Sequence, residues 1–286
     1  MRLGVDTYSY HRLLGEVRPG EEPARIRWAD PLGDVVAEAR RIGADVLSLE
    51  TSLLGPTSEV DPVLLAGAAE SVEQVIAWGA PDGIRNGTDT EAFDDLVRWI
   101  GLAGVVGCRL VRIVLGGPAL RGQLEFSRLV DSAAGMLATA ADVAESVGVR
   151  LAVENHGDAT TAQLLSAIRR ADRPGVLGVC FDTANALRVG EDATAAARAV
   201  AELTLMVHLK DVAPFDPRPS VTGPCSVAYG TGTVPIDDVL AVLATAGFEG
   251  PVLVELGQLG PGVDECALVE ECLDWLRVFT RSARTR

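Results

Sequence analysis

Cysteine is scarce in this sequence and lacks the spacing of a structural site. The five cysteines, at positions 108, 180, 225, 266 and 272, are odd in number, and no two of them form a Cys-x-x-Cys motif. Neither a disulfide framework nor a zinc knuckle is therefore indicated. Cys180 falls inside the apolar run 176–181 and is expected to be a small core residue.

Basic residues and long apolar runs are also in short supply. Lys and Arg number 25 against 40 Asp and Glu, a net charge of −15, which opposes binding to nucleic acid or to an anionic membrane surface. No apolar run approaches the roughly 20 residues of a membrane helix, and the N-terminus reaches Asp6 too early for a signal peptide. We expect a cytoplasmic protein that acts without nucleic acid or membrane, and base rates favour a homodimer.

A linker is absent as well. The 286 residues contain no Ser/Gly run, no Pro-rich hinge and no abrupt change of composition, and 48% of them are hydrophobic, which is enough for a large core. The length is normal for an α/β barrel, which typically has about 250 residues. We therefore expect a single domain over residues 1–286.

Short apolar runs alternate with longer amphipathic segments along the whole chain. Continuous apolar runs of this kind are typical of strands buried on both faces of a parallel sheet. The expected strands are 3–6, 46–49, 74–77, 110–115, 149–153, 177–181, 205–209 and 252–255. The expected helices are 31–42, 61–69 (the weakest pattern), 90–104, 126–147, 161–170, 193–203, 236–246 and 263–280.

Eight strand–helix units favour a closed barrel over an open sheet. A doubly wound sheet usually has a Gly-rich phosphate loop after its first strand, whereas residues 7–11 here read Thr-Tyr-Ser-Tyr-His. Gly43, Gly148 and Gly247 fall where the expected helices should end. The fold class we predict is α/β, a single (β/α)₈ TIM barrel.

Four successive strands in the second half of the chain end at a metal-capable residue. These residues are Glu154, Asp182, His208 and Glu255, and the carboxyl ends of barrel strands are where active sites form. One such acid often only caps the following helix, but four in succession indicate a ring of ligands. Buried carboxylates need a partner, and a divalent cation supplies one for all three. Carboxylates with one imidazole suit Mn²⁺ first, or else Mg²⁺ or Co²⁺.

His156 and Lys210 are further candidates for the chemistry, and Arg112 is a charged residue that needs a partner. His156 follows Glu154 by two positions, so we expect it to contact substrate or relay a proton, rather than to be a satisfied loop histidine. Lys210 follows the strand-seven histidine by two and faces the same side of the strand. There it can neutralise an oxyanion or form a salt bridge. Arg112 lies within a strand, so its charge should pair near the barrel centre.

Three other residues are weaker candidates for substrate binding. Asn185 can hydrogen-bond a hydroxyl or cap a helix. His11 lies in a long first loop, and loops of this kind often cover barrel mouths. Trp78, just after the third strand, can stack on a sugar face or belong to the core.

Several segments together resemble the motifs of the xylose-isomerase-like sugar isomerase/epimerase superfamily. They are GVDTYS (4–9), ENH (154–156), FDTAN (181–185), HLKD (208–211), YGTGTVPID (229–237) and VE (254–255). The resemblance implies a (β/α)₈ barrel with one Mn²⁺-type ion, for which Glu154, Asp182, His208 and Glu255 match the ligands. It also implies that Glu154 and Glu255 shuttle protons on opposite faces of a carbohydrate-like substrate.

The expected chemistry follows from that arrangement. Moving a proton beside a carbonyl needs a base, an acid and stabilisation of the enediolate, which a chelating metal supplies as a Lewis acid. We therefore expect a metal-dependent isomerase or epimerase of a sugar, sugar acid or cyclitol. The superfamily's apurinic endonuclease branch uses three zinc ions and many histidines, whereas this chain has three histidines in all.

The sequence departs from the ketose 3-epimerases of the superfamily at three places. Asn185 stands where those enzymes commonly have histidine, Thr160 where they have a substrate-binding glutamate, and the arginine expected after the strand-seven histidine has only Arg218 as a candidate. These departures argue against a plain ketose epimerase. A lyase or dehydratase acting on a keto-sugar, an inosose or a C-glycoside is the alternative, and a non-catalytic sugar-binding barrel is a third hypothesis.

Overall fold

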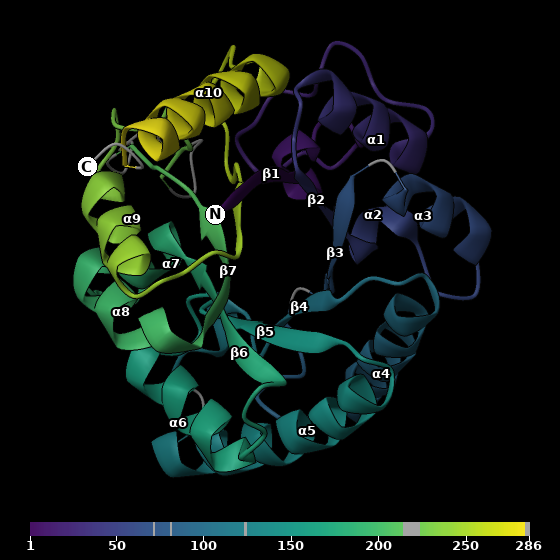
Figure 1. The fold of residues 1–286 in the computed structure, drawn as a ribbon, viewed down its shortest axis with the longest axis vertical. Coiled ribbons are helices and arrows are strands. Elements are labelled where there is room, and N and C mark those ends of the chain that lie inside the picture. The colour runs from purple at the N-terminus through teal and green to yellow at the C-terminus, as the bar shows by residue number, and fades with distance from the viewer. Residues whose placement is uncertain (71, 81, 123–124, 214–223, 284–286) are drawn as a thin grey trace.

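The computed structural model is a closed barrel of eight parallel strands, β1 to β8 in chain order, with the helices arranged around the outside (Figure 1). It describes all residues except 71, 81, 123–124, 214–223 and 284–286. Arg218, the expected arginine after the strand-seven histidine, lies outside the described residues. The α/β fold predicted from the sequence, a single (β/α)₈ TIM barrel, is confirmed.

The strands are short and evenly sized. They are β1 (Arg2–Asp6), β2 (Val46–Glu50), β3 (Glu73–Ala77), β4 (Leu110–Val114), β5 (Arg150–Glu154), β6 (Leu177–Asp182), β7 (Thr204–Leu209) and β8 (Pro251–Val254). The α-helices are α1 (Pro31–Arg41), α2 (Thr51–Leu54), α3 (Pro62–Ala69), α4 (Thr90–Val105), α5 (Phe126–Ser146), α6 (Thr161–Ala171), α7 (Thr183–Arg188), α8 (Ala193–Val200), α9 (Ile236–Thr245) and α10 (Glu265–Ala283). Three 3₁₀ turns are η1 (Thr7–Tyr10), η2 (Pro118–Leu120) and η3 (Ala201–Leu203).

Both faces of the barrel strands are buried, as the continuous apolar runs predicted. Successive side chains along a strand point to opposite faces, so Val46 packs inside the barrel while Leu47 packs outward against the helices. The interior is filled by one small cluster: Val46, Val75, Leu110, Ala152, Cys180, Met206 and Leu253. The barrel interior is therefore a packed core and not a pore.

Strand register determines which side chains share a level at the barrel mouth. Glu154 of β5 pairs with Cys180 of β6, and Asp182 pairs with His208 of β7 after a register shift between Val179 and Cys180. Because Cys180 and Asp182 are two residues apart, their side chains point to the same side of β6. The acid at the end of β6 thus lies one level beyond Glu154.

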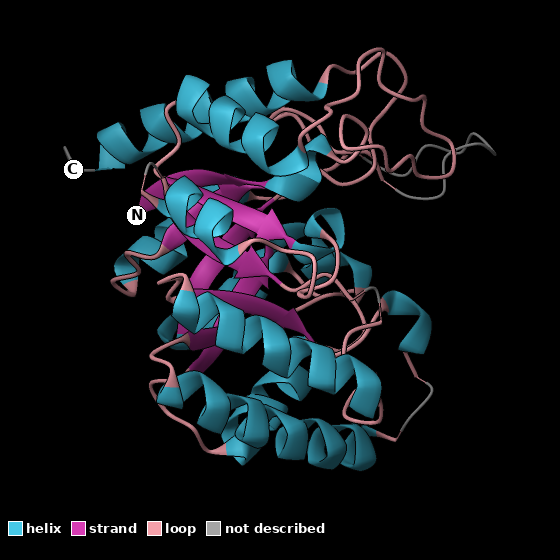
Figure 2. Ribbon diagram, turned by 90° about the vertical axis from the view of Figure 1, so that its right-hand side faces the viewer, coloured by secondary structure: helices cyan, strands magenta, loops and turns pink. Residues whose placement is uncertain are grey.

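The long loops gather on one side of the molecule, the side to which the strand arrows point in Figure 2. On the opposite side Gly43, Gly148 and Gly247 follow helices with φ of +63°, +71° and +79°, the left-handed conformation that glycine adopts most easily. The helix with the weakest sequence pattern is present as α3. Among the described residues, no helix is both long and apolar enough to cross a membrane.

Candidate functional site

Four side chains at the ends of consecutive strands come together at the mouth of the barrel. Glu154 ends β5, Asp182 ends β6, His208 is the penultimate residue of β7 and Glu255 directly follows β8. One ligand-type atom of each lies within 4.8 Å of the others, and all four residues are buried. We call them the four-residue cluster. A group of this composition and size can hold one metal ion.

Several polar atoms of the four-residue cluster have no hydrogen-bond partner within the described residues. They are Glu154 Oε2, Glu255 Oε2 and both ring nitrogens of His208. His208 Nδ1 lies 2.6 Å from Glu255 Oε2 and 3.7 Å from Glu154 Oε2, yet neither contact is a hydrogen bond. Leaving a buried polar atom unsatisfied costs about 1–3 kcal/mol. Because Glu154 Oε2, Glu255 Oε2 and His208 Nδ1 lie near one another, the residues fit a shared metal ion.

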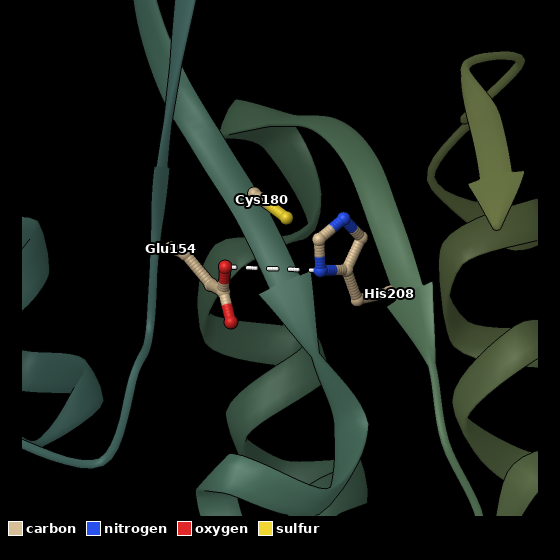
Figure 3. A group of neighbouring side chains, drawn as sticks. All are labelled: Glu154, Cys180 and His208. Atoms are coloured by element: carbon tan, nitrogen blue, oxygen red, sulfur yellow. Dashed lines mark ion pairs between the residues drawn. The ribbon is translucent and has the colours of Figure 1, made fainter. Parts of the chain in front are cut away.

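Cys180 lies beside the cluster but is a poor candidate for a ligand. Figure 3 shows its sulfur near the His208 ring, with a dashed line joining the Glu154 carboxylate to a nitrogen of the same imidazole. Burial raises the pKa of the Cys180 thiol to about 11, even though His208 pulls in the other direction. Only a thiolate binds a metal well, so the protonated thiol leaves Asp182 and Glu255 to complete the set.

Two buried cations neutralise part of the acidic charge. Lys210 Nζ lies 3.0 Å from Asp182 Oδ2 and 3.2 Å from Glu255 Oε1. Burial raises the pKa of Asp182 despite this lysine. Burial acts in the same direction on Glu255, yet Lys210 and His208 hold the pKa of that carboxyl well below its usual range. The carboxyls of Asp182 and Glu255 thus differ in pKa although both contact the same lysine.

Arg112 pairs near the barrel centre, as its place within a strand requires. Its guanidinium lies 2.5 Å from Glu50 Oε2 and 3.1 Å from Glu154 Oε2. It also donates a 3.0 Å hydrogen bond to the Trp78 carbonyl. Arg112 therefore orients Glu154 from the β4 side of the barrel.

A cavity of about 360 Å³ opens above the four-residue cluster. That volume falls within the range of small-molecule sites, about 300–1,000 Å³. His156, Asn185 and Lys210 line it, as expected for substrate-contacting residues. His156 Nδ1 lies 3.1 Å from the Gly116 carbonyl, which leaves Nε2 for a ligand. Asn185 donates a 3.2 Å hydrogen bond to Glu154 Oε1 and so contacts the cluster as well as the cavity.

Comparison with known proteins agrees with this geometry. The family model described as "Xylose isomerase-like TIM barrel" matches residues 36–278. The chain belongs to this family. A search of curated proteins found no match.

Solved structures share the fold of this xylose isomerase-like barrel at low sequence identity. A structure of L-ribulose 3-epimerase has a TM-score of 0.76 at 19% identity, covering 99% of this chain and 96% of that one. A structure of the IOLI protein with a bound zinc atom has a TM-score of 0.71 at 18% identity, covering 98% and 96%. The probable 3-DHS dehydratase AsbF from Bacillus anthracis has a TM-score of 0.69 at 15% identity, covering 97% and 99%. The likeness establishes the fold.

Several residues of the motifs that resemble the superfamily form hydrogen bonds between neighbouring strand ends of the barrel. The Asn155 side chain exchanges two hydrogen bonds with the backbone of Asp182, of 2.7 and 2.9 Å. The Thr183 hydroxyl accepts from the Lys210 N–H at 2.9 Å and donates to the Lys210 carbonyl at 2.7 Å. Near β1, the Ser9 hydroxyl donates to the Val254 carbonyl at the end of β8 and accepts from the Leu256 N–H. These side chains fix the ends of the strands that carry the cluster.

Asp211 organises the glycine-containing motif at 229–233. Its two carboxylate oxygens accept backbone N–H groups from Gly230, Gly232 and Val234 at 2.9–3.1 Å. A Cβ at Gly232 would lie 2.1 Å from Asp211 Oδ1, so the close approach requires glycine. The N–H groups of this turn are therefore already used within the protein.

Thr160 has a structural role in this barrel. It is the N-cap of α6, and its side chain forms a reciprocal capping box with Gln163. The position therefore stabilises a helix end instead of presenting a carboxylate.

His11 and Trp78, two of the expected substrate-binding residues, do not line the cavity. His11 is fully buried under the first loop, with Nδ1 2.8 Å from the Tyr8 carbonyl and Nε2 3.0 Å from Glu21 Oε2. Because side chains alternate along β3, Trp78 points away from the barrel interior and toward the helices. There its indole N–H donates to Asp95 of α4 at 2.9 Å. Both rings are buried in the protein's packing.

Sequence reasoning missed two acids that carry the same signal as the cluster. Asp6 closes β1, accepts a hydrogen bond from Ser48 at 2.5 Å, and lies 3.6 Å from His208 Nε2, where it can orient the imidazole. Glu50 closes β2 and lines the cavity. Burial raises the pKa of Glu50 to about 8 against the pull of Arg112. Each is an acid at the end of an apolar strand, so the rule that identified the cluster residues would have identified these two acids as well.

Proposed function

We propose that this protein is a metal-dependent isomerase or epimerase of a sugar, sugar acid or cyclitol. The observation that carries the proposal is the set of unsatisfied, buried ligand atoms at the floor of a cavity of about 360 Å³. The likeness to L-ribulose 3-epimerase supports a carbohydrate-like substrate.

Glu154, Asp182, His208 and Glu255 would hold the metal ion. Three carboxylates with one imidazole favour Mn²⁺, with Mg²⁺ or Co²⁺ as alternatives. The IOLI structure contains zinc, so zinc is included among the metals to be tested. When bound, the ion supplies Lewis-acid stabilisation of negative charge on the substrate's carbonyl oxygen.

The two glutamates of the cluster are placed to move protons on opposite sides of a substrate. Glu154 comes from β5 and Glu255 from the end of β8, and β6 and β7 lie between them in the barrel. One carboxylate takes a proton from the carbon beside the carbonyl, and the other returns a proton to the opposite face. Arg112 and Asn185 hold Glu154, whereas Lys210 lies 3.2 Å from Glu255.

A metal-dependent lyase or dehydratase is the second candidate. Asn185 occupies the place of a histidine that ketose 3-epimerases commonly have, and it contacts Glu154 directly. The likeness to a probable 3-DHS dehydratase also favours elimination chemistry. Both candidates begin with the same proton abstraction and differ in whether a leaving group departs. Product mass distinguishes them, because an isomerase conserves mass and a dehydratase loses water.

The test is the metal content of purified protein, measured by mass spectrometry of the elements. We expect about one equivalent of divalent metal in the wild type, and its loss in Glu154→Gln and Asp182→Asn, because each variant removes a charged ligand. Asp158→Asn is the matched control, since Asp158 is a buried acid outside the cluster. This variant should retain the metal.

Substrate screening then follows proton exchange in heavy water. Incorporation of deuterium beside the carbonyl of a candidate sugar, with the product mass otherwise unchanged, would support an isomerase. Wild-type protein that binds no metal after loading with Mn²⁺, Mg²⁺, Co²⁺ or Zn²⁺ would contradict the proposal and favour the non-catalytic sugar-binding barrel.

A further inference from the structure

Two arginines at the cavity have no ion pair or hydrogen bond to their guanidinium groups from any described residue. Arg188 is the last residue of α7, and Arg18 lies in the first loop. The other two basic chains of the cavity, Arg112 and Lys210, are already paired with buried acids. The cavity wall beyond the four-residue cluster therefore carries two positive charges that no ion pair with a described residue neutralises.

We infer that the substrate carries a carboxylate, which Arg188 and Arg18 bind while the reacting carbons lie over the four-residue cluster. A guanidinium presents parallel N–H donors that match the two oxygens of a carboxylate. The inference deepens the proposed function and rests on it for the reacting end of the substrate, because it selects sugar acids from the sugars, sugar acids and cyclitols.

Packing directs Arg188 to the β5 side of the cavity. A Cβ at Gly157 would lie 3.3 Å from Arg188 Cδ, so the arginine stem lies directly against this glycine. The Gly157 carbonyl accepts a 2.8 Å hydrogen bond from Arg121, which anchors the backbone there. His156, the preceding residue, also lines the cavity. Arg188 and His156 therefore form one wall of the site.

Arg18 is held on the β1 and β8 side. Its guanidinium carbon lies 5.3 Å from the centre of the Tyr8 ring, a cation–π contact, and its backbone N–H donates to Glu21 at 2.9 Å. Its Nη1 lies 3.5 Å from where a Cβ of Gly257 would be, and Gly257 also lines the cavity. Glu16 in the same wall accepts a 2.6 Å hydrogen bond from the Tyr8 hydroxyl and forms no ion pair with Arg18. The charge of Arg18 is thus held in place for a ligand.

The backbone groups that a phosphate would use are already occupied at two nearby turns. The glycine-containing turn at 229–233 gives its N–H groups to Asp211. The first free N–H groups of α7 are bound by Asp182 at 2.8 Å. Phosphate sites commonly rely on such N–H groups, so an anion bound by guanidinium groups alone is better matched by a carboxylate.

The experiment compares three ligands of one carbon skeleton: D-fructuronate, D-fructose and D-fructose 6-phosphate. Binding is measured by calorimetry on Mn²⁺-loaded wild type, Arg188→Ala, Arg18→Ala and the control Arg198→Ala, which removes an exposed arginine from α8. Because charge-assisted hydrogen bonds to the guanidinium groups are available only to the anion, fructuronate should bind wild type at least about tenfold more tightly than fructose. This preference should fall to near unity in Arg188→Ala, fall partly in Arg18→Ala, and persist in Arg198→Ala.

Three results would overturn the inference: equal binding of fructuronate and fructose by wild type, a preference that survives both cavity variants, or a stronger preference for the 6-phosphate. Metal content and deuterium exchange on the same samples separate this inference from the proposed function. A metal-loaded protein that exchanges protons of neutral fructose without any preference for fructuronate keeps the proposed function and loses this inference. A protein without metal loses the proposed function, while the comparison of arginine variants still decides whether the cavity selects an anion.

Discussion

Asp158 follows β5 in the chain and is an acid buried at the barrel mouth outside the four-residue cluster. Burial raises the pKa of its carboxyl to about 7, although N–H groups of Asp158 and Ala159 oppose the shift. A raised native pKa means that the folded state prefers the protonated acid. Its contribution to stability is therefore present at pH below about 4 and is lost as the pH rises through 7.

Asp158→Asn should remove this pH dependence. A shift of about three pKa units is worth at most about 4 kcal/mol, so the variant should exceed the wild type in unfolding free energy by up to that amount at pH 8. The gain should be smaller at pH 5, where the native carboxyl is already protonated. Urea unfolding at both pH values is the measurement, and an equal gain at pH 5 and pH 8 would show that the carboxyl does not titrate as described.

The sequence could identify a site residue only where strand geometry alone determines its position. Glu154 and Asp182 end apolar strands, and the carboxyl ends of barrel strands meet at one face, so their convergence follows from the fold. Arg18 and Arg188 carry no such signal, because their positions depend on the path of a loop and on a helix that begins abruptly after β6. For Trp78 the sequence left two alternatives, because one residue of strand parity decides between the cavity and the helices, and the structure shows the second.

At the scale of elements, the end of β6 combines two roles that the sequence presented as alternatives. Asp182 Oδ1 caps α7 by accepting two backbone N–H groups at 2.8 Å, while Oδ2 faces Lys210 at 3.0 Å. The cap uses only Oδ1, so Oδ2 stays available for the metal ion that we propose. The short helix itself was not predicted, because its six residues are too few for a periodic pattern.

Thr183→Val tests the connection between β6 and β7. The substitution keeps the shape of the side chain but leaves the N–H and carbonyl of Lys210 without their hydroxyl partner. We expect a loss of about 1–3 kcal/mol in unfolding free energy and weaker metal binding, because Lys210 loses its fixed position beside Asp182.

Thr183→Ser is the matched control for that variant. It retains the hydroxyl and loses one methyl group, at a cost of about 1 kcal/mol. Chemical unfolding and metal titration compare the two variants. If Ser and Val weaken metal binding equally, the two hydrogen bonds do not position the site.

At the scale of the whole molecule, acidic charge collects inside the barrel mouth as well as on the surface. Five buried acids, namely Asp6, Glu50, Glu154, Asp182 and Glu255, are accompanied by two buried basic chains, Arg112 and Lys210. Ionised groups are seldom buried without compensation. A divalent cation would bring the charge of this region close to balance, so metal binding and folding should be coupled.

Removal of metal should therefore lower the thermal stability of the protein. A ligand at one hundred times its dissociation constant stabilises the folded state by about 2.7 kcal/mol, which corresponds to about 5 °C or more in Tm for a chain of this size. Calorimetry with Mn²⁺ and with a chelator measures the shift. Asp182→Asn should be insensitive to the chelator, and a wild-type Tm that ignores both additions would contradict the coupling.

The strand ends and the cavity wall divide the molecule into two parts that can change independently. The four-residue cluster is carried by strands whose ends Asn155 and Thr183 fasten together, whereas Arg18 and Arg188 come from a loop and a helix terminus. Substitutions in the second set leave the first in place. If the two proposals hold, changes at positions 18 and 188 would alter which ligand the cavity prefers and leave the four-residue cluster as it is, so a library confined to these two positions is the smallest one in which to seek new specificities.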